Sequence, residues 1–219
     1  MKCMDKMFSK HLPGRQGDDK CRFSFSDLID KKALKQMMDS FFITTGIFHG
    51  FYDLDNKIIA SRGRQGICSD HSKAGKDSET WCQQSCKSFW EHSFDGPYPG
   101  YKCENGLMMY AAPVLVDGRK LATFFIGQIL HESPDENEFR QQAKLRGCDE
   151  QLYWEAASKI PVVSKNQIFF YIKCFTQVVG LLADLGLERM RLQEQSSITI
   201  KENEQNYRLA LEGISDGFG

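Results

Sequence analysis

Apolar and polar positions along the first part of the chain follow first a helical and then a strand-like period. From Asp30 the apolar residues recur at helical spacing and stop before Gly46, which predicts a capped helix. The apolar positions of this helix are Leu34, Met37, Met38, Phe41 and Phe42. Residues 47–52 and 57–60 are apolar segments on either side of a polar turn at 53–56, so we expect a hairpin there.

A second hairpin and a helix are predicted in the middle of the chain. Residues 107–116 and 120–128 are apolar runs that flank Asp117-Gly118, a pair suited to a tight primed turn. These strands have the composition of strands buried on both faces, or nearly so. Ser133-Pro134 then supplies a cap followed by a proline at the first helical position, which predicts a helix to about Arg146 that ends at Gly147.

The longest helical pattern opens at Ser164, where Gln167 completes a capping-box signature. Its apolar positions are spaced four, three, four and three, which resembles a short coiled-coil seam. The seam consists of Ile168, Ile172, Phe175, Val179 and Leu182. Two interpretations stay open, because an amphipathic helix can cover its own domain or pair with a second copy. We expect a homodimer formed through this helix.

Composition and charge exclude several classes of function. The 219 residues contain 28 Lys and Arg and 29 Asp and Glu, so the net charge of −1 gives no basic excess for nucleic-acid binding. The first 22 residues lack an apolar core and read as a mobile leader rather than a secretion signal. The longest uninterrupted apolar stretches, such as 107–116, fall short of the roughly 18 residues needed to span a bilayer. We therefore expect a cytoplasmic protein.

Four cysteines gather in one window, at Cys68, Cys82, Cys86 and Cys103. Cys82 and Cys86 are four residues apart, so they share one face of the helix that we expect over residues 78–94. Cys68 and Cys103 could complete four sulfur ligands for zinc or an iron–sulfur cluster. The alternatives are buried thiols, which pack as small hydrophobes, and a redox pair.

Known catalytic patterns are missing from the sequence. It contains no glycine-rich phosphate loop, no HExxH motif and no Gly-x-Ser-x-Gly elbow. A cysteine nucleophile needs a nearby histidine, and His71 and His92 are near the cysteines in sequence only. We therefore expect no enzymatic activity from this chain.

Several motifs together resemble the PocR sensory domain over about residues 23–175. They are Thr45-Gly46-Ile47, Asp53-Leu54-Asp55-Asn56, Cys68, Cys82, Cys103-Glu104-Asn105-Gly106-Leu107, Pro113, Gly118 and Phe125-Ile126-Gly127-Gln128. The resemblance implies an α+β, PAS-like fold with an antiparallel sheet flanked by helices and a long C-terminal helix. It also implies a domain that senses small organic molecules in the prokaryotic cytoplasm, ahead of a signalling output. Among the four cysteines, Cys86 has the weakest link to the family pattern, which bears on a four-cysteine metal site more than on a three-cysteine pocket.

The end of the chain carries a second resemblance. Residues 203–217 are similar to the opening of a conventional PAS domain, where a helix enters the first strand. These boundaries divide the chain into a leader (1–22), a sensory domain (23–163), a signalling helix (164–206) and the start of a PAS domain (207–219). The output module of such a sensor, as in a two-component system, is a histidine kinase or a diguanylate cyclase.

Aromatic and sulfur side chains near the cysteine window are the candidates for a ligand pocket. The candidate residues are Phe48, Phe51, Cys68, Trp81, Cys82, Phe89, Trp90, Cys103, Tyr110, Phe125 and Gln128. For each aromatic residue the alternative is an ordinary place in the core. Gln128 closes an apolar strand and, if buried, needs a hydrogen-bond partner, which a ligand or the backbone could supply.

Overall fold

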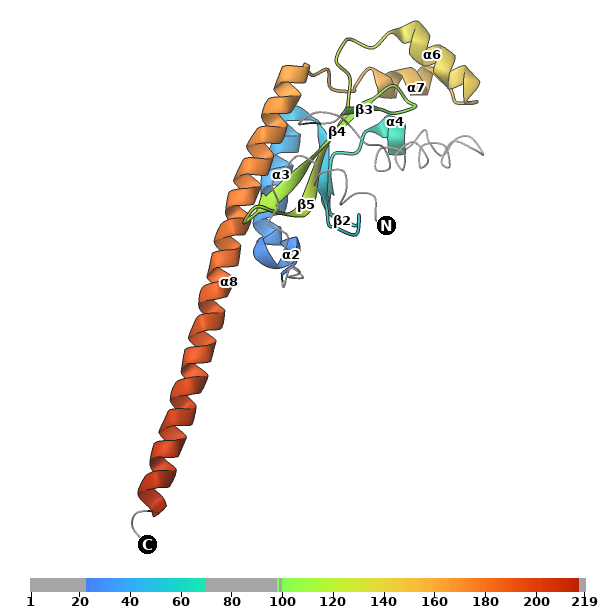
Figure 1. Cartoon of the computed structure of the whole chain (residues 1–219). Coiled ribbons are helices and arrows are strands. Elements are labelled where there is room, and N and C mark those ends of the chain that lie inside the picture. Colours follow the sequence, from blue (N-terminus) through green and yellow to red (C-terminus); the bar gives the residue numbers. More distant parts are fainter. Residues whose placement is uncertain (1–22, 70–97, 99, 217–219) are drawn as a thin grey trace.

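The computed structural model describes residues 23–69, 98 and 100–216. A five-stranded antiparallel sheet in the order β2-β1-β5-β4-β3 forms the centre of the domain. Helices α3 and α8 cover one face of this sheet, whereas α6 and α7 lie together at one end (Figure 1). The α+β arrangement predicted from the sequence is confirmed.

The predicted first helix and hairpin are present. Helix α3 (Lys31–Thr45) begins at Asp30, whose carboxylate accepts hydrogen bonds from the amides of Lys32 and Ala33. It ends at Gly46, which takes the left-handed conformation of a helix C-cap. Strands β1 (Phe48–Tyr52) and β2 (Ile58–Arg62) then form the hairpin. The short helix α2 (Phe25–Leu28) precedes α3.

The second hairpin supplies the two central strands and carries two bulges. Strands β4 (Met108–Val116) and β5 (Arg119–Ile129) turn at Asp117-Gly118, where both residues have positive φ as the sequence predicts. The register shifts once between Met108 and Met109 and again between Val114 and Leu115. The first shift leaves Gln128 without a partner in β4, which makes it a bulged residue. Strand β3 (Gly100–Lys102) completes the sheet.

Smaller helices enclose a second hydrophobic cluster at one end of the sheet. They are α4 (Gly66–Ser69), α6 (Glu136–Leu145) and α7 (Glu150–Ala157). The expected cap of α6 at Ser133 is wrong, because Asp135 caps this helix through a hydrogen bond from the amide of Glu138. An aspartate carboxylate at the N-cap also interacts favourably with the helix dipole.

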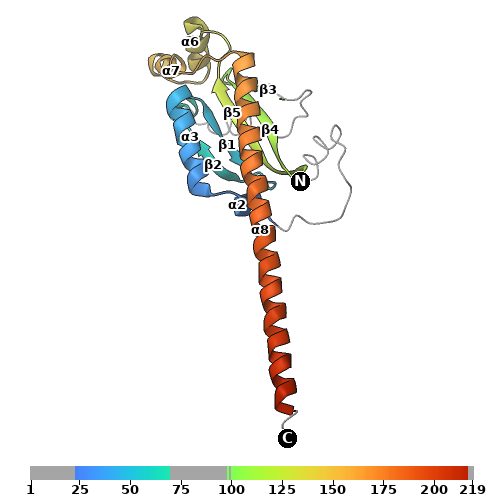
Figure 2. The ribbon, with the colours of Figure 1, turned by 90° about the vertical axis from the view of Figure 1, so that its left-hand side faces the viewer.

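Helix α8 (Lys165–Asp216) is the longest element and opens with the predicted Ser164–Gln167 capping box. Its first half packs across the sheet beside α3, and its second half extends beyond the domain (Figures 1 and 2). The helix continues without a break past residue 206, through the stretch assigned to the start of a PAS domain.

The predicted seam of α8 faces its own domain rather than a partner. Ile168, Ile172, Phe175 and Val179 are buried in the main core. Leu182 does not belong with them, because its side chain is 47% exposed and Ala183 is buried instead. The pattern of a straight helix repeats every 3.6 residues rather than every 3.5, so a seam at strict heptad spacing drifts off the contact face.

Candidate functional site

The two faces of the sheet differ in what they hold. Alternate residues of β1, β4 and β5 enter the main core beneath α3 and α8, where Phe51, Phe124 and Ile126 are fully buried. The opposite face holds Phe48 and Phe125, two of the residues that the sequence analysis selects as candidates for ligand contact, and for this reason we call it the ligand face; it is defined by the register of the three strands. Its positions are Phe48, Gly50 and Tyr52 in β1, Met109, Ala111 and Pro113 in β4, and Thr123, Phe125 and Gly127 in β5.

Aromatic rings and small residues alternate on the ligand face. The Phe125 ring centroid lies 5.2 Å from that of Phe48 and 4.6 Å from that of Tyr52. Gly50 lies directly opposite Phe125, and a Cβ at this position would overlap the Phe125 ring and the backbone of Ala60. The absence of a side chain at Gly50 therefore lets the Phe125 ring lie flat across the strand.

Thr123 is the polar group of this face. Its side chain is only 2% exposed, and its hydroxyl has no hydrogen-bond partner within the part of the chain that the structure describes. Thr123 pairs with Tyr52 and Pro113 across the strands, so its hydroxyl lies next to the aromatic group. Because an unpaired buried hydroxyl is unfavourable, it needs a partner that the described residues do not supply.

The bulge at Gln128 directs that side chain away from the sheet. Its φ of 52° places a residue other than glycine in the left-handed region, as a bulge requires. The side-chain oxygen accepts a hydrogen bond of 2.8 Å from the amide of Gln65, whose own side chain donates to the Gly46 carbonyl. Backbone rather than ligand thus satisfies the Gln128 carbonyl, and the contact fixes the loop that leads into α4.

Cys68 and Cys103 lie in the second hydrophobic cluster rather than on the ligand face. Cys68 is buried, and Cys103 is half-buried beside the same group. A third thiol, Cys148, is buried there as well and was missed because it lies far from the cysteine window in sequence. Apolar side chains form the rest of this cluster, including Ile67, Leu107, Phe139 and Ile160.

Arg146 ties this cluster to the turn that carries Cys103. Its guanidinium donates to the Glu104 carbonyl at 2.6 Å, to the side-chain oxygen of Asn105 and to the Tyr153 hydroxyl. Burial raises the pKa of Tyr153, so its hydroxyl stays protonated at physiological pH. The Asn105 of the Cys103–Leu107 motif therefore has a structural role in holding α6 and α7 to the sheet.

Tyr110 belongs to the main core and connects the sheet to the start of α8. Its hydroxyl lies 2.6 Å from His131 Nε2, while His131 Nδ1 lies 2.6 Å from the Val163 carbonyl. A carbonyl only accepts, so Nδ1 carries a proton, and in the neutral ring Nε2 then accepts from the Tyr110 hydroxyl. Burial raises the pKa of Tyr110, which keeps this donor protonated.

The structure therefore separates the candidate residues into groups. Phe48 and Phe125 share the ligand face, whereas Phe51 and Tyr110 belong to the main core. Sequence reasoning missed Tyr52 and Thr123, which the strand register adds to the ligand face. Five further candidates lie outside the described residues: Trp81, Cys82, Cys86, Phe89 and Trp90.

A metal site cannot be assembled from the described residues alone. Among residues 23–69, 98 and 100–216, no group of three or more Cys, His, Asp or Glu side chains is arranged to hold a metal ion. The proposed set of Cys68, Cys82, Cys86 and Cys103 includes two residues outside this part, so it stays a prediction. The first 22 residues, read from sequence as a leader, also lie outside it.

Comparisons with known proteins give one match. A family model described as the sensory domain found in PocR matches residues 27–187, which is most of the chain and includes the sheet, helices α3, α4, α6 and α7, and α8 as far as Leu187. A search of curated proteins found no match, and a search of solved structures found none either.

Proposed function

The chain belongs to the family of the sensory domain found in PocR, and from this we propose that it binds a small organic molecule on the ligand face of its sheet. Membership of this family gives the chain a signal-input role. The class of ligand and the place where it binds are what we propose beyond that role. We further propose that the domain works in the cytoplasm as the input of a histidine kinase or diguanylate cyclase, without a catalytic step of its own.

The unpaired Thr123 hydroxyl is the observation that supports this location most strongly. It lies buried beside Phe125 and Tyr52, on a face whose other positions, apart from the Tyr52 hydroxyl, are small or apolar. Sites for small molecules are mostly apolar and use a few polar groups to fix orientation. A ligand with one hydroxyl, carbonyl or amine group would satisfy Thr123 while its carbon chain contacts the rings.

The connection between β5 and α8 supports transmission through the long helix. The Leu130 amide donates to the Pro161 carbonyl at 3.0 Å, and the Val163 amide donates to the Leu130 carbonyl at 2.8 Å. Both contacts lie between the end of β5 and the start of α8. A ligand that binds one arrangement of β5 better than another would therefore shift the population of α8 positions.

Native mass spectrometry of protein taken directly from cells tests the proposed site. We expect added mass of a small molecule on the wild type, and about fivefold weaker retention in Thr123→Val, since one hydrogen bond contributes about 1 kcal/mol. The same variant without ligand should gain about 1 kcal/mol in unfolding free energy in urea, because an unpaired buried hydroxyl is removed.

Thr45→Val is the matched control. The Thr45 hydroxyl already donates to the Phe41 carbonyl at 2.8 Å in α3, so this variant should keep the bound mass. Equal retention by Thr123→Val and wild type would contradict the proposed location. The proposed location would also be contradicted if the wild type carried no added mass and its melting temperature did not change with short-chain alcohols, acids or amines at millimolar concentration.

A cysteine-based metal or redox sensor is the second candidate. It is supported by the presence of Cys68, Cys103 and Cys148 in one cluster, where Cys82 and Cys86 would have to complete a zinc or iron–sulfur site. Such a site would contribute folding free energy directly. Elemental analysis and visible absorption of anaerobically purified wild type and Cys82→Ser separate this candidate from the first.

A further inference from the structure

Helix α8 has a second apolar face in addition to the one that packs on the sheet. Leu181, Leu185 and Leu192 are 62%, 54% and 58% exposed. Together with Cys174 and Val178, which are also exposed, they follow one another at intervals of four, three, four and seven residues. These intervals match the 3.6-residue turn, so the five side chains form one stripe along the helix. We call it the outer stripe.

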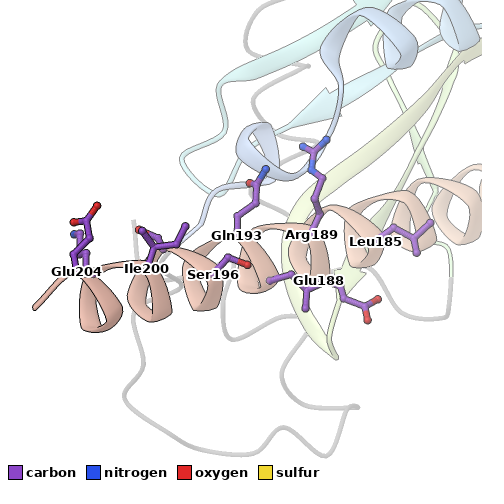
Figure 3. Close-up of a pocket in the computed structure, with 10 residues that line it drawn as sticks. Leu185, Glu188, Arg189, Gln193, Ser196, Ile200 and Glu204 are labelled. Carbon is purple, nitrogen blue, oxygen red and sulfur yellow. The ribbon is translucent and has the colours of Figure 1, made fainter. Parts of the chain in front are cut away.

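Within the described part of the chain, no element covers the outer stripe (Figure 2). A shallow hollow begins at Leu185 and Leu192 of this stripe and extends along α8 to Glu204, and the residues that line it all belong to α8 (Figure 3). Beyond Glu194 every described side chain up to Leu209 is exposed. A single helix in water is marginal without a packed apolar face, so this segment needs a partner.

We propose that the partner is a second copy of this chain, with the two α8 helices parallel and in register along the outer stripe. A two-fold axis parallel to the helices places each stripe residue opposite its own copy, so a stripe of uniformly apolar character is complementary to itself. From Cys174 to Leu192 the helix rises about 27 Å, so a strip about 10 Å wide on each copy buries about 540 Å² in total along the outer stripe. The exposed part of α8 beyond Leu192 extends past the domain and would supply the rest of the roughly 1,000 Å² that a specific interface needs.

The charges beside the stripe agree with this arrangement. Glu188 and Arg189 point to opposite sides of α8 at the same level of the helix (Figure 3). In a parallel two-fold pair, the left edge of one stripe meets the right edge of the other. Glu188 of each copy therefore lies beside Arg189 of its partner, whereas like charges would face each other if both edges carried the same sign.

A membrane is the competing partner for an apolar helix face. One window of 18 residues in α8 has a mean hydropathy of 1.6, which is high enough by composition to cross a bilayer. However, 33% of that window is buried within the protein, where Ile168, Ile172 and Phe175 hold the helix on the sheet. Charged residues such as Lys173 and Asp184 also interrupt it. The folded domain therefore favours a protein partner.

Sedimentation equilibrium of the whole chain at about 1 to 100 micromolar tests whether two copies associate. We expect a dimer for the wild type and at least a hundredfold weaker association for Leu185→Glu, because two carboxylates would face each other in the apolar stripe. Ile198→Glu is the matched control, since Ile198 is 52% exposed on another side of α8. It should stay dimeric. Circular dichroism confirms that each variant is folded.

Oxidative crosslinking tests the register. Exposed Cys174 lies on the stripe, so parallel copies bring their two thiols close enough for a disulfide. Copper phenanthroline should produce a covalent dimer in the wild type that is lost in Cys174→Ser. A monomer at every concentration overturns the proposal, as does a monomer that sediments with phosphatidylcholine–phosphatidylglycerol vesicles. A dimer that survives Leu185→Glu, or crosslinks equally well in Cys174→Ser, overturns the outer stripe as the interface.

Discussion

His49 is a titratable side chain enclosed by aromatic rings. Its ring centroid lies 4.8 Å from that of Phe41, 5.5 Å from that of Phe175 and 6.4 Å from that of Phe124. Nδ1 donates to the Ile47 carbonyl at 2.9 Å. Loss of solvent around the ring lowers the pKa of His49, and the nearby Asp39 carboxylate opposes this only in part. The native protein therefore keeps this ring neutral.

The stability of the protein should consequently depend on pH through His49. In the unfolded chain the imidazole binds a proton below about pH 6.5, whereas the native ring binds it only at lower pH. The unfolded state thus holds more protons below pH 6.5, and the free energy of unfolding should fall as the pH is lowered from 7 to 5 by up to about 1.4 kcal/mol per pH unit. Urea titrations at several pH values measure this slope.

His49→Asn supplies the comparison, because an amide cannot titrate in this range. Its slope between pH 7 and 5 should be shallower than that of the wild type, while its stability at pH 7 is lower. An identical slope in both proteins would show that other groups cause the pH dependence.

Single residues of the site were predictable only where chemistry alone marked them. Phe48 and Phe125 stand out as aromatic residues in apolar strands, and the need of Gln128 for a partner is readable from its position. Thr123 is different, because it lies inside an apolar run, and whether its hydroxyl can contact a ligand depends on which face of the sheet it occupies. That face depends on the strand register, which the bulges at Met108–Met109 and Val114–Leu115 shift.

At the scale of elements, the crossing of α2 and α8 brings two helix backbones close together. Gly186 of α8 lies against the backbone of Leu28, and a Cβ at this position would overlap the Leu28 carbonyl. Leu28 is buried in the main core, so α2 cannot move away without exposing it. The glycine therefore allows the two backbones to approach, at the cost of helix propensity.

Replacing Gly186 with alanine should destabilise the protein. In an exposed helix this change stabilises by about 1 kcal/mol, but overlap with a fixed backbone should reverse the sign and cost about 1–3 kcal/mol. Gly180→Ala is the comparison on the same helix, because its Cβ would lie 3.1 Å from the Leu115 carbonyl and requires only a small shift. Chemical denaturation ranks the two variants. A more stable Gly186→Ala would contradict the contact.

Elements with strong local signals were predicted well, and their packing was predicted less well. The cap at Asp30, the Asp117-Gly118 turn and the Ser164–Gln167 box were all readable, because each depends on residues close in sequence. Which face of α8 packs on the sheet could not be predicted, because a helix with two apolar faces has the same composition whichever face meets the sheet. The exposure of Leu182 followed only from the way that α8 packs on β4 and β5.

At the scale of the whole molecule, the sheet and α8 meet through one joint. The Leu130–Val163 backbone pair and the Tyr110–His131–Val163 hydrogen bonds both end just before α8 begins. Thr123 lies on β5, the strand that leads into Leu130. A shift in the position of β5 can therefore reach the start of α8 through a few covalent and hydrogen bonds.

Hydrogen exchange should reveal this route in protein that retains its cellular ligand. Compared with the ligand-free protein, we expect slower exchange in β5 and altered exchange at residues 168–185. In Tyr110→Phe, which removes the donor to His131, the change in β5 should persist while that in α8 becomes smaller. If exchange in α8 responds equally in both proteins, the joint does not carry the signal.

The glycine crossing gives the long helix the mechanics of a lever. Ile168 and Gly186 are about 27 Å apart along α8, and about 45 Å of helix extends from Gly186 to Asp216. With Gly186 as the fulcrum, a shift of about 1 Å at the short arm swings the tip by nearly 2 Å in the opposite direction. On the proposed function, a ligand would need to move the start of α8 by less than the width of an atom for the end of the helix at Asp216 to undergo a larger displacement.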